Sequence, residues 1–136
     1  MKNTCQGIFI AMLFAFCSNS LLSQQVNPKI QEIYGDKTQE LVLNNPNQLA
    51  LLNDLLDNRI SVIESAISSE EKFIKLSEIA LLNKYNPNLT RDIVFDPLNF
   101  NPLKYDLNFL PKTPMVYRVD NTNYLLVIKP QTLKKD

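Results

Sequence analysis

Five prolines lie between Pro87 and Pro114, and they constrain the fold more than any other feature of this chain. Proline fixes its own backbone angle and has no N–H to donate, so this segment can form neither a long helix nor a central strand. Large apolar side chains alternate with these prolines, whereas a disordered linker would lack them. They are Phe95, Leu98, Phe100, Leu103, Tyr105, Leu107, Phe109 and Leu110. We therefore expect an extended strap, with turns at the prolines, that lies across the preceding helices.

The first of those helices is predicted over 46–67. Asn45 suits a helix cap, and Pro46 suits the first helical position, where a missing N–H costs nothing. Apolar residues then recur at helical spacing from Leu49 to Ile67, with polar residues on the opposite side. A strand fits only locally, around Ser61, so the helix is preferred.

A second helix is predicted to follow directly. Ser68 and Glu71 have the spacing of a capping box. The helix should end near Tyr85, because a residue that precedes a proline, such as Asn86, avoids helical geometry. Residues 46–85 together predict a helical hairpin.

The end of the chain predicts a β-hairpin, with arms at 115–119 and 124–129. Residues 120–123, Asp-Asn-Thr-Asn, supply turn residues that tolerate unusual backbone angles. The fold class is therefore α+β: a helical hairpin covered by a proline-punctuated extended strap and a C-terminal β-hairpin. We assign 46–130 to a single small domain, 24–45 to a polar lead-in and 131–136 to a polar tail. Whether the lead-in folds with the domain stays open, although Pro28 suits the start of a short helix.

Residues 1–23 predict a signal peptide. An unbroken apolar run at 8–16 follows Lys2 and precedes small polar residues. This run is too short to span a bilayer as a helix, which needs about 20 residues. Cleavage after Ser20 or after Ser23 both fit. A lipoprotein attached through Cys17 is not favoured, because a small residue normally precedes the lipid-bearing cysteine and Phe16 stands there. The expected location is the periplasm or the cell surface.

Several chemistries are excluded by composition. The chain has no histidine, and both cysteines, Cys5 and Cys17, lie within the predicted signal. A Ser-His-Asp or Cys-His nucleophile, and a zinc site of the usual kind, therefore lack their residues. Only Gly35 remains outside the signal, which excludes a glycine-rich phosphate-binding loop. We predict a non-enzymatic protein without cofactor or metal, and a carboxylate-only hydrolase using Asp54 and Asp57 is the less favoured alternative.

Charge and hydropathy limit the classes of partner that we expect for this chain. The net charge of the chain is zero, and nucleic-acid binding rests on phosphate neutralisation by a basic face. We therefore expect no nucleic-acid partner. No second apolar run approaches the length of a membrane span, so we expect no integral membrane segment after signal removal.

Aromatic residues gathered in the last third of the chain are the best candidates for partner contact. The predicted contact residues are Lys104, Tyr105, Tyr117, Arg118 and Tyr124. Tyrosine and arginine are enriched at the energetic centres of protein interfaces. The other interpretation, which the sequence favours, is that most of these aromatics cover the helices and form the core, so that only some of them remain exposed for a partner.

Two segments carry a resemblance: 101–105, Asn-Pro-Leu-Lys-Tyr, and 117–124, which begins Tyr-Arg-Val-Asp-Asn-Thr. They resemble small uncharacterised exported envelope proteins of gliding-type bacteria. The resemblance covers the last 45 residues or so and implies no catalytic residue. The function expected from sequence is that of a non-enzymatic exported envelope protein acting by protein–protein interaction, accessory to a surface or outer-membrane system. A small-ligand or glycan-binding module that uses the C-terminal aromatics is the alternative.

Overall fold

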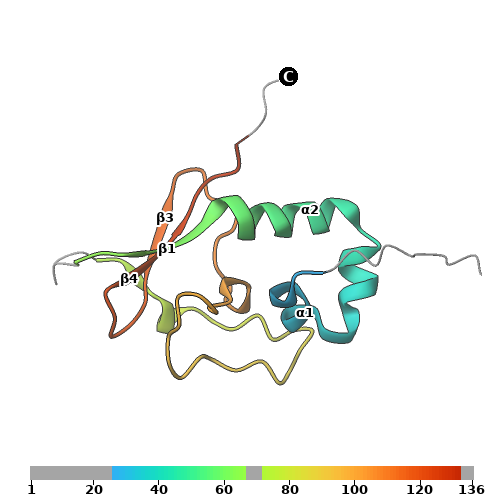
Figure 1. Ribbon diagram of the computed structural model, residues 1–136, viewed down its shortest axis with the longest axis horizontal. Coiled ribbons are helices and arrows are strands. Elements are labelled where there is room, and N and C mark those ends of the chain that lie inside the picture. Colours follow the sequence, from blue (N-terminus) through green and yellow to red (C-terminus); the bar gives the residue numbers. More distant parts are fainter. Residues whose placement is uncertain (1–25, 67–71, 133–136) are drawn as a thin grey trace, which may run out of the picture.

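The computed structural model describes residues 26–66 and 72–132 (Figure 1). The predicted signal peptide at 1–23 lies outside these residues. So do Ser68 and Glu71, the predicted capping box, and the last residues of the polar tail.

The first part of the described chain is helical. Its elements are α1 (Pro28–Tyr34), a 3-10 turn (Gly35–Lys37), a π-helical turn (Gln39–Leu43), α2 (Pro46–Asp54) and a second π-helical turn (Leu55–Arg59). The predicted cap is confirmed, since Asn45 Oδ1 accepts a hydrogen bond of 3.2 Å from the N–H of Gln48. Pro46 is the first residue of α2 and Pro28 is the first residue of α1. Both prolines therefore mark helix starts, as the sequence indicates.

The segment predicted as a polar lead-in packs with the rest of the chain. Ile30, Ile33 and Val42 are buried in one cluster with apolar residues of α2 and of the strap. The question that the sequence left open is therefore answered: the lead-in folds with the domain. α1 and the π-helical turn Gln39–Leu43 supply three of the eight buried residues of this cluster.

The prediction of one helix over 46–67 is wrong from Ile60 onward, as far as residue 66, where the described segment ends. The helix ends in the π-helical turn, where the N–H of Ile60 bonds to the carbonyl of Leu55, and strand β1 (Ile60–Glu64) begins at once. β1 pairs antiparallel with β4 (Tyr124–Ile128) along its whole length. This pairing explains the change, because β-branched residues such as Ile60 and Val62 favour a strand when a partner strand is present.

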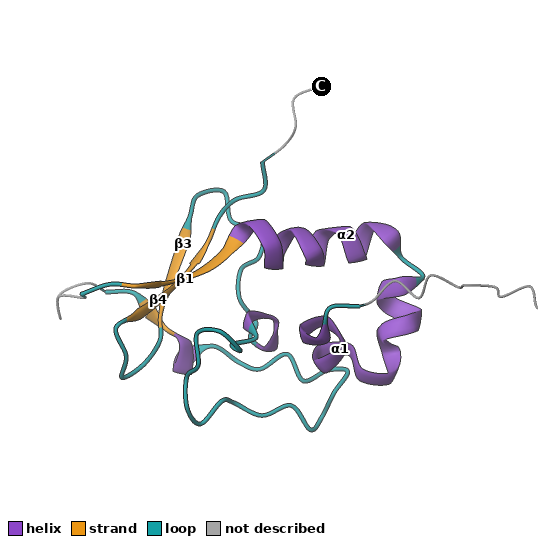
Figure 2. Cartoon of the chain, viewed as in Figure 1, coloured by secondary structure: helices purple, strands orange, loops and turns teal. Residues whose placement is uncertain are grey.

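The strands gather at one end of the described chain, where α2 leads into β1 (Figure 2). They form one four-stranded sheet in the order β1-β4-β3-β2. β3 (Met115–Arg118) and β4 form the predicted C-terminal hairpin, and β2 (Ile74–Lys75) runs parallel to β3. Asn121 takes a left-handed backbone angle, φ 57°, in the hairpin turn. The hairpin is therefore confirmed, with a turn chemistry that asparagine tolerates.

The predicted second helix is wrong. Its described residues form β2, a 3-10 turn (Leu76–Glu78) and irregular chain. The backbone is paired elsewhere: the N–H of Leu82 bonds to the carbonyl of Lys104 at 2.7 Å, and the N–H of Asp106 bonds to the carbonyl of Ala80 at 2.9 Å. Hydrogen bonds to the strap thus replace those of a helix.

The strap joins two apolar clusters, one under the helices and one under the sheet. Leu89 and Leu103 belong to the helical cluster, whereas Phe100, Tyr105 and Leu107 belong to the sheet cluster. A 3-10 turn (Pro102–Lys104) lies at the crossing, and Asn101 bonds from there to the carbonyl of Lys29 in α1. The α+β class and the C-terminal hairpin are confirmed, while the helical hairpin is replaced by a helix that continues into a strand. No helix among the described residues is long and apolar enough to cross a membrane.

Candidate functional site

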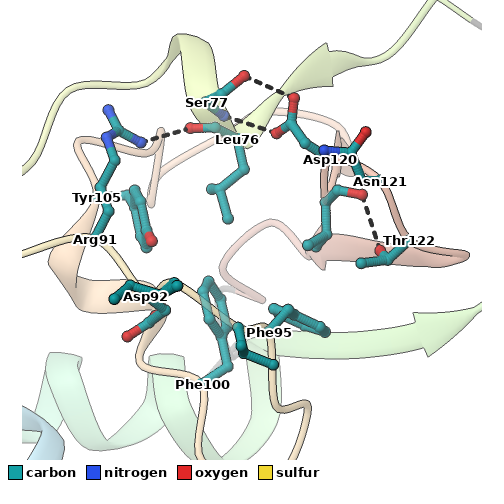
Figure 3. A pocket seen from close by; sticks show the side chains of 13 residues that line it. Leu76, Ser77, Arg91, Asp92, Phe95, Phe100, Tyr105, Asp120, Asn121 and Thr122 are labelled. Atoms are coloured by element: carbon teal, nitrogen blue, oxygen red, sulfur yellow. Dashed lines mark hydrogen bonds between the residues drawn. The ribbon is translucent and has the colours of Figure 1, made fainter.

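A cavity of about 470 Å³ lies where the strap meets the hairpin turn and the 3-10 turn after β2 (Figure 3). Aromatic side chains line one side of it and polar side chains the other. Among the lining residues are Leu76, Ser77, Arg91, Asp92, Phe95, Phe100, Tyr105, Asp120, Asn121 and Thr122. An apolar hollow with a few converging polar groups is the usual form of a binding site.

Phe95, Phe100 and Tyr105 form the aromatic side of the cavity, and Tyr124 extends this row to four rings outside the lining. Tyr124 and Phe95 have ring centroids 5.3 Å apart, Phe95 and Phe100 5.1 Å, and Phe100 and Tyr105 5.7 Å. Arg91 lies over the far ring, with its guanidinium carbon 5.6 Å from the Tyr105 centroid. Ring pairs at these distances stabilise one another beyond their buried area. The row is therefore a rigid floor.

On the polar side of the cavity, the carboxylate of Asp120 binds Ser77. Asp120 accepts hydrogen bonds from the N–H of Ser77 at 2.9 Å and from its hydroxyl at 2.7 Å (Figure 3). Partial burial alone would raise the pKa of Asp120, but the hydrogen bonds from Ser77 outweigh it and lower that pKa. Asp120 is therefore ionised at neutral pH, and it joins the hairpin turn to the turn after β2.

Two cationic side chains fix the strap beside the cavity. Arg91 donates to the carbonyls of Leu76 and Ile79. Lys104 is buried, and its Nζ lies 2.7 Å from Oδ1 of Asp92 and 3.9 Å from Oε1 of Glu32. Burial raises the pKa of Tyr105, and the charge of Asp92 adds to this effect. The start of the strap is therefore anchored to α1 and to the chain that follows β2.

Beyond this anchor the strap turns its apolar side chains to solvent. Ile93 is fully exposed, and Val94 and Leu98 are 79% and 86% exposed. Asp96 holds this loop in shape by accepting from the N–H of Leu98 at 3.0 Å and from the side chain of Asn99. The hydrogen bond from Asn99 is the main reason that the pKa of Asp96 is lowered. We call residues 93–98 the apolar loop.

The predicted contact residues divide into buried and half-buried ones. Lys104, Tyr105 and Tyr117 are 5%, 3% and 3% exposed, so they form part of the interior and not an accessible patch. This agrees with the alternative that the aromatics form the core. Arg118 and Tyr124 are half-buried on β3 and β4, and contact through them stays a prediction.

Sequence reasoning missed the apolar loop and the bond between Ser77 and Asp120. Ile93 and Val94 look like core residues in the sequence, because hydrophobicity does not reveal which way a side chain points. An aspartate at position 92 or 96 suits the cap of a turn, and Asp96 does cap one. Asp92 pairs with Lys104 instead.

Among the described residues, no group of three or more His, Cys, Asp or Glu side chains is placed to hold a metal ion. Comparison with models of known protein families, with curated proteins and with solved structures finds no match to this chain. The cavity and the apolar loop are therefore the features from which a function can be proposed.

Proposed function

We propose that this chain is an exported envelope protein that acts by binding another protein and does not catalyse a reaction. Export rests on the sequence of residues 1–23, with the periplasm or the cell surface as the location. Binding rests on the apolar loop and the cavity beside it.

The observation that carries the proposal is the exposure of three large apolar side chains on one short loop. Ile93, Val94 and Leu98 have little contact with the rest of the described chain. Apolar side chains that gather on a surface mark interaction sites, because water contact with them is unfavourable. An apolar segment of a partner protein would remove this surface from water, which stabilises a complex by about 25 cal/mol for each Å² buried.

The loop is also prepared for binding by its anchors. Lys104 with Asp92 fixes one end of it, and the turn built on Asp96 fixes the other. A loop that is already ordered loses less conformational entropy when a partner binds. An apolar side chain of the partner would enter the cavity and rest on the aromatic row.

The polar groups at the cavity support a binding role over a catalytic one. Asp120 is already occupied by Ser77, and Arg91 by two carbonyls. The pKa of Asp120 is lowered and that of Tyr105 is raised, so neither group changes charge near neutral pH. General acid–base catalysis needs a group with its pKa near the working pH.

Site-specific photo-crosslinking in native cell envelopes tests the proposal. A photoreactive residue at Ile93 should capture one dominant protein, which mass spectrometry would identify. The matched control is the same residue at Leu110, which is 61% exposed but does not line the cavity. Equal capture at both positions, or no protein enriched at Ile93, would overturn the proposal. Capture of lipid at Ile93 without protein would instead identify a membrane-binding loop.

A second candidate function is the binding of a glycan or another small ligand. The observation that favours it is an aromatic row that faces polar side chains, among them Asn121 and Thr122, across one cavity. Amide-proton NMR shifts on addition of soluble cell-wall oligosaccharides test this function. Shifts confined to the cavity residues, and lost in Phe95→Ala, would support it. An unchanged spectrum at millimolar oligosaccharide would remove it.

A further inference from the structure

Strand β1 lies at one end of the sheet, and its outer edge is open among the described residues. β4 pairs with one side of β1, and no described strand pairs with the other. β1 contains no proline, lysine or bulge, which are the features that usually block an edge. The opposite edge differs, because β2 has only two residues and one of them is Lys75.

The backbone groups that face this open edge can be assigned. The N–H of Lys129 bonds to the carbonyl of Arg59, and the N–H of Ser65 bonds to the carbonyl of Asn123. Hydrogen bonding alternates along an antiparallel pair, so Ser61 and Ile63 also bond toward β4. The residues between them turn their N–H and C=O groups outward.

Val62 and Glu64 therefore present both backbone groups to the edge. Ile60 presents only its carbonyl, because its N–H is already bonded to the carbonyl of Leu55. An incoming strand must match this pattern of donors and acceptors.

We propose that β1 pairs antiparallel with β1 of a second copy of this chain, about a two-fold axis at Ile63. Val62 of each copy then exchanges both backbone hydrogen bonds with Glu64 of the other. A two-fold axis at Val62 would instead place Ile60 opposite Glu64 of the other copy. The carbonyl of that Glu64 would then lack a donor, because the N–H of Ile60 is already bonded to Leu55. The available donors thus favour the axis at Ile63 over the axis at Val62.

Side chains at the edge fit a second copy in this register. The two Ile63 residues face each other in a non-hydrogen-bonded pair, where Cα atoms are about 4.5 Å apart. Ile63 is 43% exposed in the single chain, and this contact would cover it. Glu64 lies opposite Val62 and not opposite a second Glu64, so like charges do not meet directly. Self-complementarity of this kind is what a two-fold interface requires.

The face of the sheet that carries Ile63 would also continue from one copy to the next. Leu125 lies opposite Ile63 on β4, so both side chains belong to the same face of the sheet. Val127 and Val116 share this face, by the registers of β4 with β1 and β3, and they are half-buried. The dimer would carry one sheet of twice the width.

Sedimentation velocity on the full chain tests the dimer. We expect the wild-type protein to self-associate, and we expect Ile63→Lys to weaken association by about tenfold or more, because two lysines would meet at the axis. The matched control is Ile74→Lys. Ile74 is 42% exposed on the opposite edge strand, so this variant should associate like the wild type.

Mixing charge variants tests the two-fold axis itself. Ile63→Lys and Ile63→Glu should each be monomeric, whereas an equimolar mixture should form a heterodimer, since residue 63 meets only itself. Circular dichroism would confirm that each variant is folded. A wild-type chain that stays monomeric up to hundreds of micromolar would overturn the proposal, and this result needs no variant. A dimer that is as stable in Ile63→Lys as in the wild type, or a mixture that associates no better than either variant alone, would also overturn it.

Discussion

The ammonium group of Lys104 lies 2.7 Å from Oδ1 of Asp92, although the lysine side chain is only 6% exposed. This pair joins the 3-10 turn of the strap to the base of the apolar loop. Glu32 in α1 lies 3.9 Å from the same ammonium group, so the helices, the strap and the loop meet at one buried charge. A buried cation is tolerated only where carboxylates compensate for the water that it has lost.

Replacing Lys104 with methionine should therefore destabilise the domain by about 1–3 kcal/mol, because Asp92 and Glu32 lose their cation while the apolar stem is kept. Urea unfolding followed by circular dichroism would measure the change. The control is Lys37→Met, since Lys37 and Glu40 form a pair of 3.0 Å with both side chains more than half exposed. That variant should leave stability unchanged. If the two variants lowered the free energy of unfolding equally, the buried pair of Lys104 would stabilise the domain no more than the exposed pair of Lys37.

Asp120 should link stability to pH. Its pKa in the folded chain lies below the ordinary value of 3.8. The resulting stabilisation is fully present above pH 3.8 and is lost as the pH falls through the lower pKa of the folded state. Ser77→Ala removes the hydroxyl donor, so the pKa of Asp120 should rise toward its ordinary value and acid unfolding should begin at a higher pH.

Carboxyl-carbon NMR titration measures this pKa directly. Asp96 provides an internal control, because its pKa is lowered by Asn99 and not by Ser77. A Ser77→Ala spectrum in which Asp120 titrates as in the wild type would show that the hydroxyl does not hold the carboxylate.

Tyr117 should behave as a core residue and not as a contact residue. It is 3% exposed, and its phenol oxygen accepts a hydrogen bond of 3.2 Å from the N–H of Asn108. Tyr117→Ala should cost about 3–5 kcal/mol, as for other large aromatic residues in cores. Tyr117→Phe should cost only about 1 kcal/mol, the value of one hydrogen bond.

Arg118 is the neighbouring residue for comparison. It is half-buried on β3, and Arg118→Ala should change stability by less than about 0.5 kcal/mol. Thermal unfolding of the three variants would rank them. If Tyr117→Ala unfolded no more easily than Arg118→Ala, the burial of Tyr117 in the sheet cluster would be refuted.

Arg59 should not be replaceable by lysine. Its guanidinium is buried at the junction of the π-helical turn and β1, and it donates to the carbonyls of Lys129 and Phe109. A single ammonium group cannot reproduce this fork of donors. Arg59→Lys should destabilise the chain by about 2 kcal/mol, because one of the two carbonyls loses its hydrogen bond from a charged donor. Urea unfolding would measure this change, and Arg118→Lys, at a half-buried position, should show no loss.

Parts of this fold were predictable because they depend on neighbours in sequence. Asn45 and Pro46 begin a helix wherever they occur together with helix-forming residues after them. The turn residues at 120–123 likewise specify a hairpin. The strap was predictable from prolines that forbid regular structure. Each of these signals acts over a few residues, so the sequence shows it directly.

The errors came from partners that are far away in the chain. Ile60–Glu64 has helical spacing with the residues before it, yet it forms β1 because β4 supplies a complementary edge about sixty residues later. Leu81 has helical spacing too, but it pairs with Tyr105 in an isolated bridge. Periodicity reports which side chains share a face and says nothing of which strand lies beside them.

The sequence by itself determined the helix starts, the turn of the C-terminal hairpin, the irregular strap and the missing catalytic residue types, because each depends on residue identity and short spacing. Only the tertiary structure decided that a helix becomes β1, that Lys104, Tyr105 and Tyr117 are interior, and that Ile93 and Val94 face solvent. Burial and strand pairing are set by segments that meet in space, and the free energy of those contacts exceeds local preference.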